Sequence, residues 1–315
     1  MSAHQSRNPC KARSLRPGAR LAVVAPASPA NPLKIEAGTR EVQRLGFSVL
    51  PPAARSADGY FAASAAARRQ EFLGALADPT ADALLALRGG YGSNYLLEGL
   101  DAAALPTPKC LIGYSDLTTL QVFLWQRLGW ISFYGPMLAA GFDAGAGKPD
   151  GYDEASFLRA TGETSSGWSL DLQGESLEGG EAQGRLLGGS LTLLEATIGT
   201  PWQLDAAGAI LVLEDRAMKP YQVDRMLMHL VQAGIFAEIQ GIVLGDFPEC
   251  EPPAAGSPTV RDVCMRILGG HGLPVVYGAP VGHTARPMLT LPLGVEARVV
   301  AEGAGTLEIL EAAVI

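Results

Sequence analysis

Charged residues are sparse in this chain, and a basic surface is missing. Charged side chains make up 18% of the 315 residues, and the formal net charge is −8. A nucleic-acid-binding protein needs a basic face to neutralise phosphates, and no basic stripe with interleaved aromatic residues occurs here. The composition therefore favours a soluble enzyme or a small-molecule binder, with no nucleic-acid partner.

Cysteine is also scarce, and its spacing excludes two common motifs. The four cysteines form no Cys-x-x-Cys pair, so neither a zinc ribbon nor a thioredoxin-like motif is expected. A chain of this length needs no disulfide framework, and the spacing does not indicate one.

Long hydrophobic runs are absent as well. No segment approaches the roughly 18 uninterrupted apolar residues of a membrane span. Arg13, Arg16 and Arg20 precede LAVVAPASPA, but the apolar run stops at Pro26 and is too short for a signal peptide. We interpret residues 21–25 as a first buried strand and expect a cytoplasmic protein without a membrane partner.

Glycine and proline, by contrast, are plentiful, with 38 and 22 residues, and they separate short apolar runs. In the first half these runs (21–26, FSVLPP, 81–87 and 110–115) alternate with helical patterns near 35–45, 65–76 and 117–124. Apolar strands alternating with helices are typical of a parallel sheet covered on both faces. We predict a flexible tail at 1–19 and an N-terminal α/β domain at 20–145.

The pattern changes after a glycine-rich polar stretch, which we interpret as a linker at 146–178. Strands are expected within 168–189, 209–215, 241–247, 274–283 and 295–310, with helices near 190–199, 220–233 and 259–268. The helix near 220–233 is amphipathic and should end at Gly234. The fold class is therefore α/β, with a parallel-sheet N-terminal domain and a β-rich C-terminal α/β domain at 179–315.

GYSDLTTL (113–120) is the first segment able to support chemistry. A buried strand leads into Ser115 and a helix follows, so the hydroxyl lies at the sheet edge where α/β folds bind ligands. The amide of Asp116 and the helix N-terminus would stabilise a developing oxyanion. The segment resembles a nucleophile elbow, although it lacks the full G-x-S-x-G pattern. A serine here can also be a simple helix N-cap.

RGGYGSN (88–94), the glycine-rich loop, also follows a buried strand. It lacks the Walker pattern, and GAGKPD (145–150) has no Ser or Thr after its lysine, so we predict neither nucleotide binding nor another cofactor. Gly90 or its neighbours could provide a second oxyanion donor, or could form a turn with positive φ. Arg88 and Tyr91 are candidates to bind a substrate carboxylate.

A serine nucleophile needs a base, and the chain has four histidines. His4 is in the tail, His229 in a helix and His271 in a GGHG turn, which leaves His283 at a strand end. An acidic partner would orient its imidazole. Glu214 ends the strand AILVLED, and Asp215 is the neighbouring alternative.

Five blocks carry a resemblance to a known family. RGGYGSN, IGYSDLTTL, GRLLGGSLTLLEATIGTPW, LEDRAMKPYQVDRMLMHL and GAPVGHTARPMLTLPLG resemble, in order, the signature blocks of the LD-carboxypeptidase family. The resemblance spans roughly 20–312 and implies a serine peptidase with the triad Ser115, Glu214 and His283 in a cleft between two domains. It also implies a homodimer that uses no metal.

The family resemblance implies hydrolysis of an L,D amide bond, which releases a terminal D-amino acid from murein tetrapeptides in peptidoglycan recycling. The oxyanion donors would be the amides of Gly90 and Asp116. The chain has Ser190 where the family often has Asn, and it lacks the acidic residue that the family often has after LED, near Met218, which bears on substrate detail. The first alternative is hydrolysis of a peptidyl-adenylate antibiotic, as in microcin C self-immunity peptidases. Such relatives carry extra loop aromatics, whereas 247–258 offers only Phe247. A non-catalytic two-domain binder of a small ligand is the second alternative.

Overall fold

Six strands form the first sheet of the molecule, in the order β12-β5-β4-β3-β1-β2. The computed structural model describes residues 8–52 and 56–315. Strands β1 to β5 run parallel, and β12 is antiparallel to β5. The bounds are β1 (Arg20–Val24), β2 (Ser48–Leu50), β3 (Ala83–Ala86), β4 (Cys110–Gly113), β5 (Ser132–Tyr134) and β12 (Leu291–Leu293). The parallel strands predicted for the first half are confirmed.

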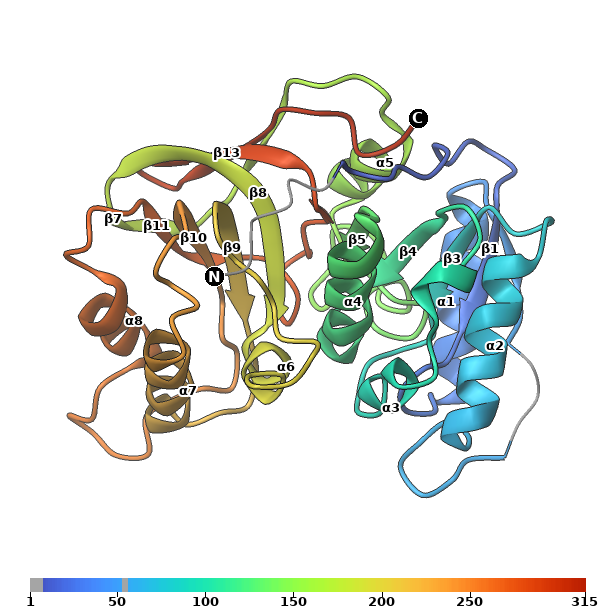
Figure 1. The fold of residues 1–315 in the computed structure, drawn as a ribbon, viewed down its shortest axis with the longest axis horizontal. Helices are drawn as coiled ribbons and strands as arrows, with labels where there is room; N and C mark the ends of the chain where they lie inside the picture. The colour runs from blue at the N-terminus through green and yellow to red at the C-terminus, as the bar shows by residue number, and fades with distance from the viewer. Residues whose placement is uncertain (1–7, 53–55) are drawn as a thin grey trace.

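Helices cover this first sheet (Figure 1). They are α1 (Pro32–Arg44), α2 (Ala65–Ala77), α3 (Asn94–Leu97), α4 (Thr118–Leu128) and α5 (Glu154–Gly162), with 3-10 turns η1 (Ala102–Ala104) and η2 (Ser115–Leu117). All four residues of β3 and of β4 are buried, which fits their continuous apolar sequence. The first half therefore folds as its alternating pattern predicts.

Eight strands form the second sheet, in the order β6-β14-β13-β8-β9-β10-β11-β7. Its centre, β8 to β11, is parallel, and its outer strands are antiparallel. The strands are β6 (Trp168–Asp171), β7 (Glu175–Glu178), β8 (Gly180–Ser190), β9 (Ala209–Glu214), β10 (Gly241–Gly245), β11 (Val275–Ala279), β13 (Glu296–Ala301) and β14 (Thr306–Ile309); the helices are α6 (Leu191–Ala196), α7 (Pro220–Gln232) and α8 (Val260–Leu268).

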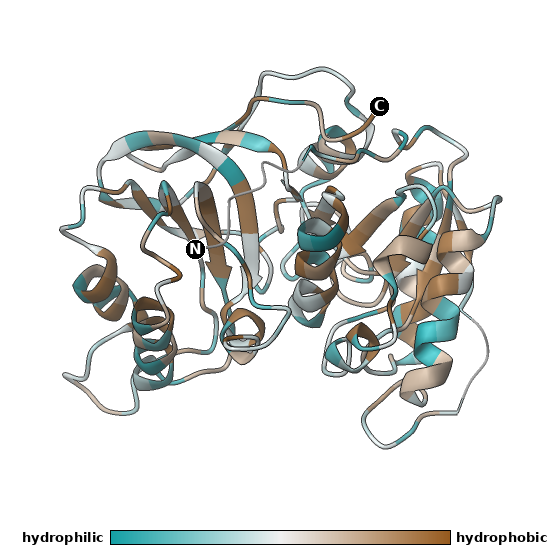
Figure 2. Ribbon diagram, in the orientation of Figure 1, coloured by the Kyte–Doolittle hydropathy of each residue, from teal (hydrophilic) through white to brown (hydrophobic). Residues whose placement is uncertain are grey.

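Apolar faces of the helices hold the second sheet together. Helix α7 begins with Pro220, buries Val223, Leu227 and Leu230 on one face, and is followed by Gly234 with φ of 76°. Figure 2 shows hydrophobic strands in the interior and hydrophilic residues on the helices outside them. The amphipathic pattern thus places the predicted helix correctly, including its end.

The segment between the sheets contains more structure than its polar sequence indicates. Helix α5 lies within 146–178, where the Asp153 carboxylate caps it by accepting the Ser156 N–H at 2.6 Å. Strands β6 and β7 belong to the second sheet, whereas β12, from late in the chain, pairs with β5 of the first. The domain limits predicted from the sequence stay a prediction. Across the described ranges, no helix is long and apolar enough to cross a membrane.

Two helical glycines provide a matched test of the packing. A Cβ at Gly38 in α1 would collide with the backbone carbonyl of Leu138, whereas a Cβ at Gly74 in α2 would meet open space. We expect Gly38→Ala to lower the free energy of unfolding by about 1–3 kcal/mol, because the backbone must shift. Gly74→Ala should raise it by about 0.5–1 kcal/mol, because Ala restricts the unfolded chain. Denaturant titration of both variants measures this, and equal effects would contradict the close contact of α1 with residue 138.

Candidate active site

Ser115 lies at a strained turn between β4 and α4. Strand β4 ends at Gly113, and Ser115 adopts a left-handed φ of 63°, a conformation that costs a non-glycine residue of order 1–3 kcal/mol. Gly89 of the glycine-rich loop lies so close that a Cβ there would be 2.9 Å from Ser115 Oγ. Strained backbone of this kind is typical of functional sites.

Glu214 and His283 form the second part of the site. Glu214 ends β9, its side chain has no solvent exposure, and its Oε2 lies 2.8 Å from Nδ1 of His283. The same oxygen accepts the backbone N–H of His283 at 2.8 Å. Because a carboxylate can only accept, Nδ1 carries the hydrogen and Nε2 is left as an acceptor. This tautomer is the one that a general base requires.

Two glycines make room for the Glu214 carboxylate. A Cβ at Gly282, whose φ is 63°, would collide with the Glu214 carboxyl carbon, and a Cβ at Gly245 would lie 2.6 Å from Glu214 Cβ. Both positions therefore depend on the absence of a side chain. Gly245 ends β10, and Gly282 lies in the segment that follows β11.

Tyr134 connects the two parts of the site, a role that the sequence did not predict. Its hydroxyl donates to Glu214 Oε1 at 2.5 Å and accepts the backbone N–H of Ser115 at 3.2 Å. The neighbouring Tyr114 ring lies edge-on to the His283 ring, with centroids 5.1 Å apart. The structure thus links the backbone of Ser115 to Glu214 through Tyr134, and Glu214 to His283. Ser115 Oγ makes no hydrogen bond to the imidazole in the described part of the chain. The one sequence signal for Tyr134 was its place at the end of a strand beside β4.

The electrostatics of the buried pair follow from its geometry. Burial alone would raise the pKa of Glu214, but the charge and hydrogen bonds of His283, together with Tyr134, lower it below its ordinary value. Burial would likewise lower the pKa of His283, but the charge and hydrogen bond of Glu214 outweigh it, and the pKa is raised above 6.5.

Asp215, the alternative acid, has a different role. Its Oδ2 accepts the backbone N–H of Thr192 at 2.8 Å and the hydroxyl of Thr192 at 2.6 Å. Ser190 Oγ lies 3.4 Å from the same oxygen and makes no capping bond to α6. Asp215 therefore ties β9 to the start of α6, and the structure pairs Glu214 with His283.

The predicted oxyanion and substrate residues lie in the glycine-rich loop and directly after Ser115 in the chain. Gly90 has φ of 114°, and together with Tyr91 and Asp116 it borders a cavity of about 500 Å³ that reaches Thr192 and Trp202. Asp116 is fully buried, and burial raises the pKa of its carboxyl despite a hydrogen bond from Ser93. Arg88 is bonded to the Pro29 carbonyl at 3.4 Å. The oxyanion and carboxylate-binding roles stay predictions.

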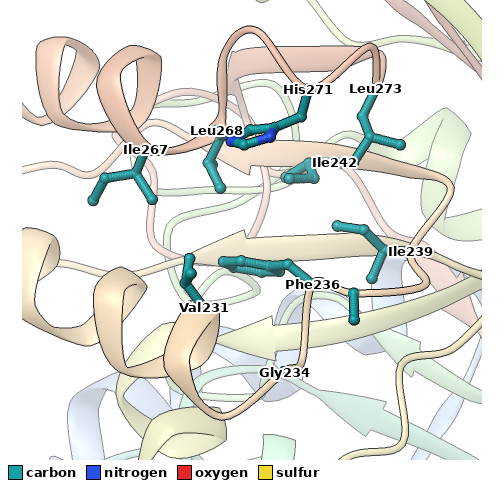
Figure 3. Close-up of a pocket in the computed structure, with 10 residues that line it drawn as sticks. Val231, Gly234, Phe236, Ile239, Ile242, Ile267, Leu268, His271 and Leu273 are labelled. Carbon is teal, nitrogen blue, oxygen red and sulfur yellow. The ribbon is translucent and has the colours of Figure 1, made fainter.

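The other histidines outside the tail lie elsewhere. His229 pairs with Glu195 at 2.8 Å on the surface, and His271 borders an apolar pocket of about 430 Å³ (Figure 3). That pocket includes Ile242 near the start of β10, whereas Glu214 ends the neighbouring parallel strand β9. The pocket and the Glu214–His283 pair therefore lie at opposite ends of the parallel strands. His4 lies outside the described residues. Between residues 8–52 and 56–315, no group of three or more His, Cys, Asp or Glu residues could hold a metal ion.

Known proteins share this arrangement of two domains. The LD-carboxypeptidase N-terminal domain family matches residues 21–135, and the LD-carboxypeptidase C-terminal domain family matches residues 183–299. The chain is 33% identical to the probable murein peptide carboxypeptidase of Bacillus subtilis, over 91% of this chain and 90% of the relative. It is 30% identical to the microcin C7 self-immunity protein MccF of Escherichia coli, over 82% of this chain and 83% of the relative.

Solved structures that resemble this chain indicate the same family as the sequence relatives. The muramoyltetrapeptide carboxypeptidase of Oxalobacter formigenes superimposes with a TM-score of 0.82 at 29% identity, over 93% of this chain and 99% of that one. MccF in complex with glutamyl sulfamoyl guanosine gives a TM-score of 0.86 at 25% identity, over 98% and 100%. The chain belongs to the LD-carboxypeptidase family. Its two-domain α/β fold and its membership of a hydrolase family are as predicted.

The contact between Glu214 and His283 predicts how the pKa of the His283 imidazole responds to loss of the Glu214 charge. Glu214→Gln removes the charge that raises the pKa of His283, so burial then dominates and the pKa should fall below its wild-type value. Titration of the imidazole by NMR measures the change. Glu195→Gln removes the partner of another histidine, His229, and is the matched control that should leave His283 unaffected. An unmoved pKa in Glu214→Gln would show that the pair does not form in solution.

Proposed function

We propose that this protein is a serine-type LD-carboxypeptidase that releases a terminal D-amino acid from murein tetrapeptides. Ser115 is the nucleophile, His283 the general base and Glu214 the residue that orients it. The observation that carries the proposal is the buried Glu214 carboxylate, whose two oxygens reach His283 on one side and, through Tyr134, the backbone of Ser115 on the other.

The proposed chemistry assigns a step to each of these residues. Ser115 Oγ attacks the carbonyl of the scissile amide while Nε2 of His283 takes the hydroxyl proton. The negative oxygen of the tetrahedral intermediate is held by the amides of Gly90 and Asp116. His283 then donates its proton to the leaving amine, and water hydrolyses the acyl-enzyme by the same steps in reverse. Glu214 stabilises the imidazolium formed in each half-reaction.

The relatives support the substrate class. The names of the Bacillus subtilis and Oxalobacter formigenes proteins specify murein peptide and muramoyltetrapeptide carboxypeptidases. A cavity of about 500 Å³, bordered by Gly90 and Asp116, is large enough for a short peptide, and Asp116 follows Ser115 in the chain. We extend the proposal to a cytoplasmic homodimer that acts in peptidoglycan recycling.

Hydrolysis of a peptidyl-adenylate is the second candidate, because solved MccF structures resemble this chain and one holds aspartyl sulfamoyl adenosine. The loop 247–258, however, offers no aromatic ring for stacking a base. Its Phe247 is buried, and its ring stacks on Tyr277 with centroids 6.3 Å apart. We therefore rank the murein substrate first.

Removing the hydroxyl of Ser115 tests the nucleophile. Ser115→Ala should fold normally and lose about 10⁴-fold or more in kcat on a tetrapeptide with an L,D-linked terminal residue. Mass spectrometry of the released amino acid provides the assay, with a D,D-linked peptide and a peptidyl-adenylate as alternative substrates. Ser169→Ala, on the exposed face of β6, is the matched control and should keep full activity. Turnover by Ser115→Ala at the wild-type rate would refute the mechanism, and a wild type inactive on every substrate would favour a non-catalytic binder.

The pH dependence of the reaction tests the base. His283 accepts a proton only when neutral, so kcat/KM should fall as the pH drops through its pKa, which lies above 6.5. Glu214→Gln should move this acid limb to lower pH while reducing the plateau by about 10⁴-fold. An acid limb centred below 6.5 in the wild type would argue against His283 as the base.

A further inference from the structure

Arg68 is a buried cation that no carboxylate neutralises directly. Its side chain is 1% exposed, although it lies on helix α2. Its guanidinium donates to three backbone carbonyls: Ala63 at 2.9 Å, Gly92 at 2.8 Å, and Pro26. None of the described carboxylates lies within ion-pair distance of it. Burying a charge in this way is costly unless it stabilises something in return.

Asp116 is the complementary buried acid: burial raises the pKa of its carboxyl group, and the charge of Arg68 opposes that shift. It follows Ser115 in the chain and has no solvent exposure. Its Oδ2 accepts the backbone N–H of Ser93 at 2.7 Å, and its Oδ1 has no partner among the described residues. A buried carboxylate oxygen without a partner is rare in folded proteins, which points to a functional constraint on this position.

The two charges act on one peptide group. The Gly92 carbonyl that accepts from Arg68 and the Ser93 N–H that donates to Asp116 belong to the same peptide bond. The cation thus lies at the negative end of the peptide dipole and the anion at its positive end, and hydrogen bonds to charged groups are about twice as strong as neutral ones. Each charge compensates the other through the polarised peptide.

Close packing leaves this peptide group little freedom. A Cβ at Gly92, whose φ is 133°, would lie 2.6 Å from Arg68 Nη1 and 2.7 Å from the ring of Phe61. The Arg68 guanidinium in turn lies over that ring, 4.7 Å from its centroid. Figure 1 shows α2, which carries Arg68, beside α3, which follows the glycine-rich loop.

We propose that Arg68 and Asp116 are positioning residues that clamp the Gly92–Ser93 peptide and thereby hold the glycine-rich loop against Ser115. The loop residue Gly89 lies against Ser115 Oγ, and Gly90, the predicted oxyanion donor, is next in the chain. A shift of the clamped peptide therefore moves the donor relative to the nucleophile. The catalytic part of this inference rests on the proposed peptidase function, whereas the structural part does not.

Three variants in the full-length protein separate charge from packing. Asp116→Asn keeps the size and an acceptor oxygen but loses the charge, and Asp116→Ala loses both. Arg68→Lys keeps the charge but cannot span the same carbonyls. Asp101→Asn is the matched control. Asp101 is an exposed carboxylate that caps η1 by accepting the backbone N–H of Ala103, and Asn can make the same bond.

Hydrogen exchange and kinetics are measured on each variant. We expect amide exchange in 88–94 to accelerate by about tenfold in Asp116→Asn and further in Asp116→Ala, because a charge-assisted bond is lost. On the L,D-linked peptide, kcat should fall by about 10- to 100-fold with little change in KM, because the oxyanion donor is displaced. Losses in the Arg68→Lys/Asp116→Asn double variant should be smaller than the sum of the single losses, because both residues act on one peptide.

The outcomes separate the clamp from the peptidase function. Unchanged exchange in 88–94 in both Asp116 variants, or exchange that rises equally in Asp101→Asn, overturns the clamp. Faster exchange with unaltered kcat overturns its positioning role. If Asp116→Ala does not fold, Asp116→Asn and Arg68→Lys decide the matter by the same readouts. Should the wild type hydrolyse no peptide, the proposed function fails, and exchange alone then decides whether the clamp exists.

Discussion

The buried carboxylate of Glu214 is the constraint on which the site depends. An ionised carboxyl group without solvent is tolerated only when donors surround it, and here the donors come from separate parts of the chain. The hydroxyl of Tyr134 belongs to the first sheet, whereas the backbone and ring N–H groups of His283 follow the last parallel strand of the second. The charge is satisfied only when the two sheets meet in this arrangement, so the fold and the orientation of the imidazole are fixed by the same bonds.

Much of this arrangement could be predicted from the sequence, because strand ends are visible in it. Apolar runs that stop at Ser115, Glu214 and His283 place these side chains at the edges of sheets, where parallel strands direct catalytic groups. Glu214 and Asp215 were indistinguishable, since both follow the same strand and only tertiary contacts separate a partner of His283 from a partner of Thr192.

Other features were hidden because their meaning lies in distant contacts. Tyr134 ends a three-residue strand whose apolar neighbours indicate only core packing, and its hydroxyl gains a role through residues far away in the chain. Arg68 lies on helix α2, and arginine side chains ordinarily face solvent, so the sequence did not indicate that this one is buried. The pairing of β12 with β5 joins segments about 160 residues apart, a distance at which periodicity carries no information.

The left-handed turn at Ser115 explains how one short segment serves several partners. Three consecutive residues face three different parts of the molecule: Tyr114 packs on the His283 ring, the amide of Ser115 donates to Tyr134, and Asp116 binds the glycine-rich loop. A continuous strand would direct alternate side chains to opposite faces and could not make these contacts together. The strain stored at φ of 63° is thus offset by contacts on each side. The backbone geometry of this turn therefore connects the glycine-rich loop, which holds the predicted oxyanion donor, to the part of the site that the Glu214 carboxylate holds together.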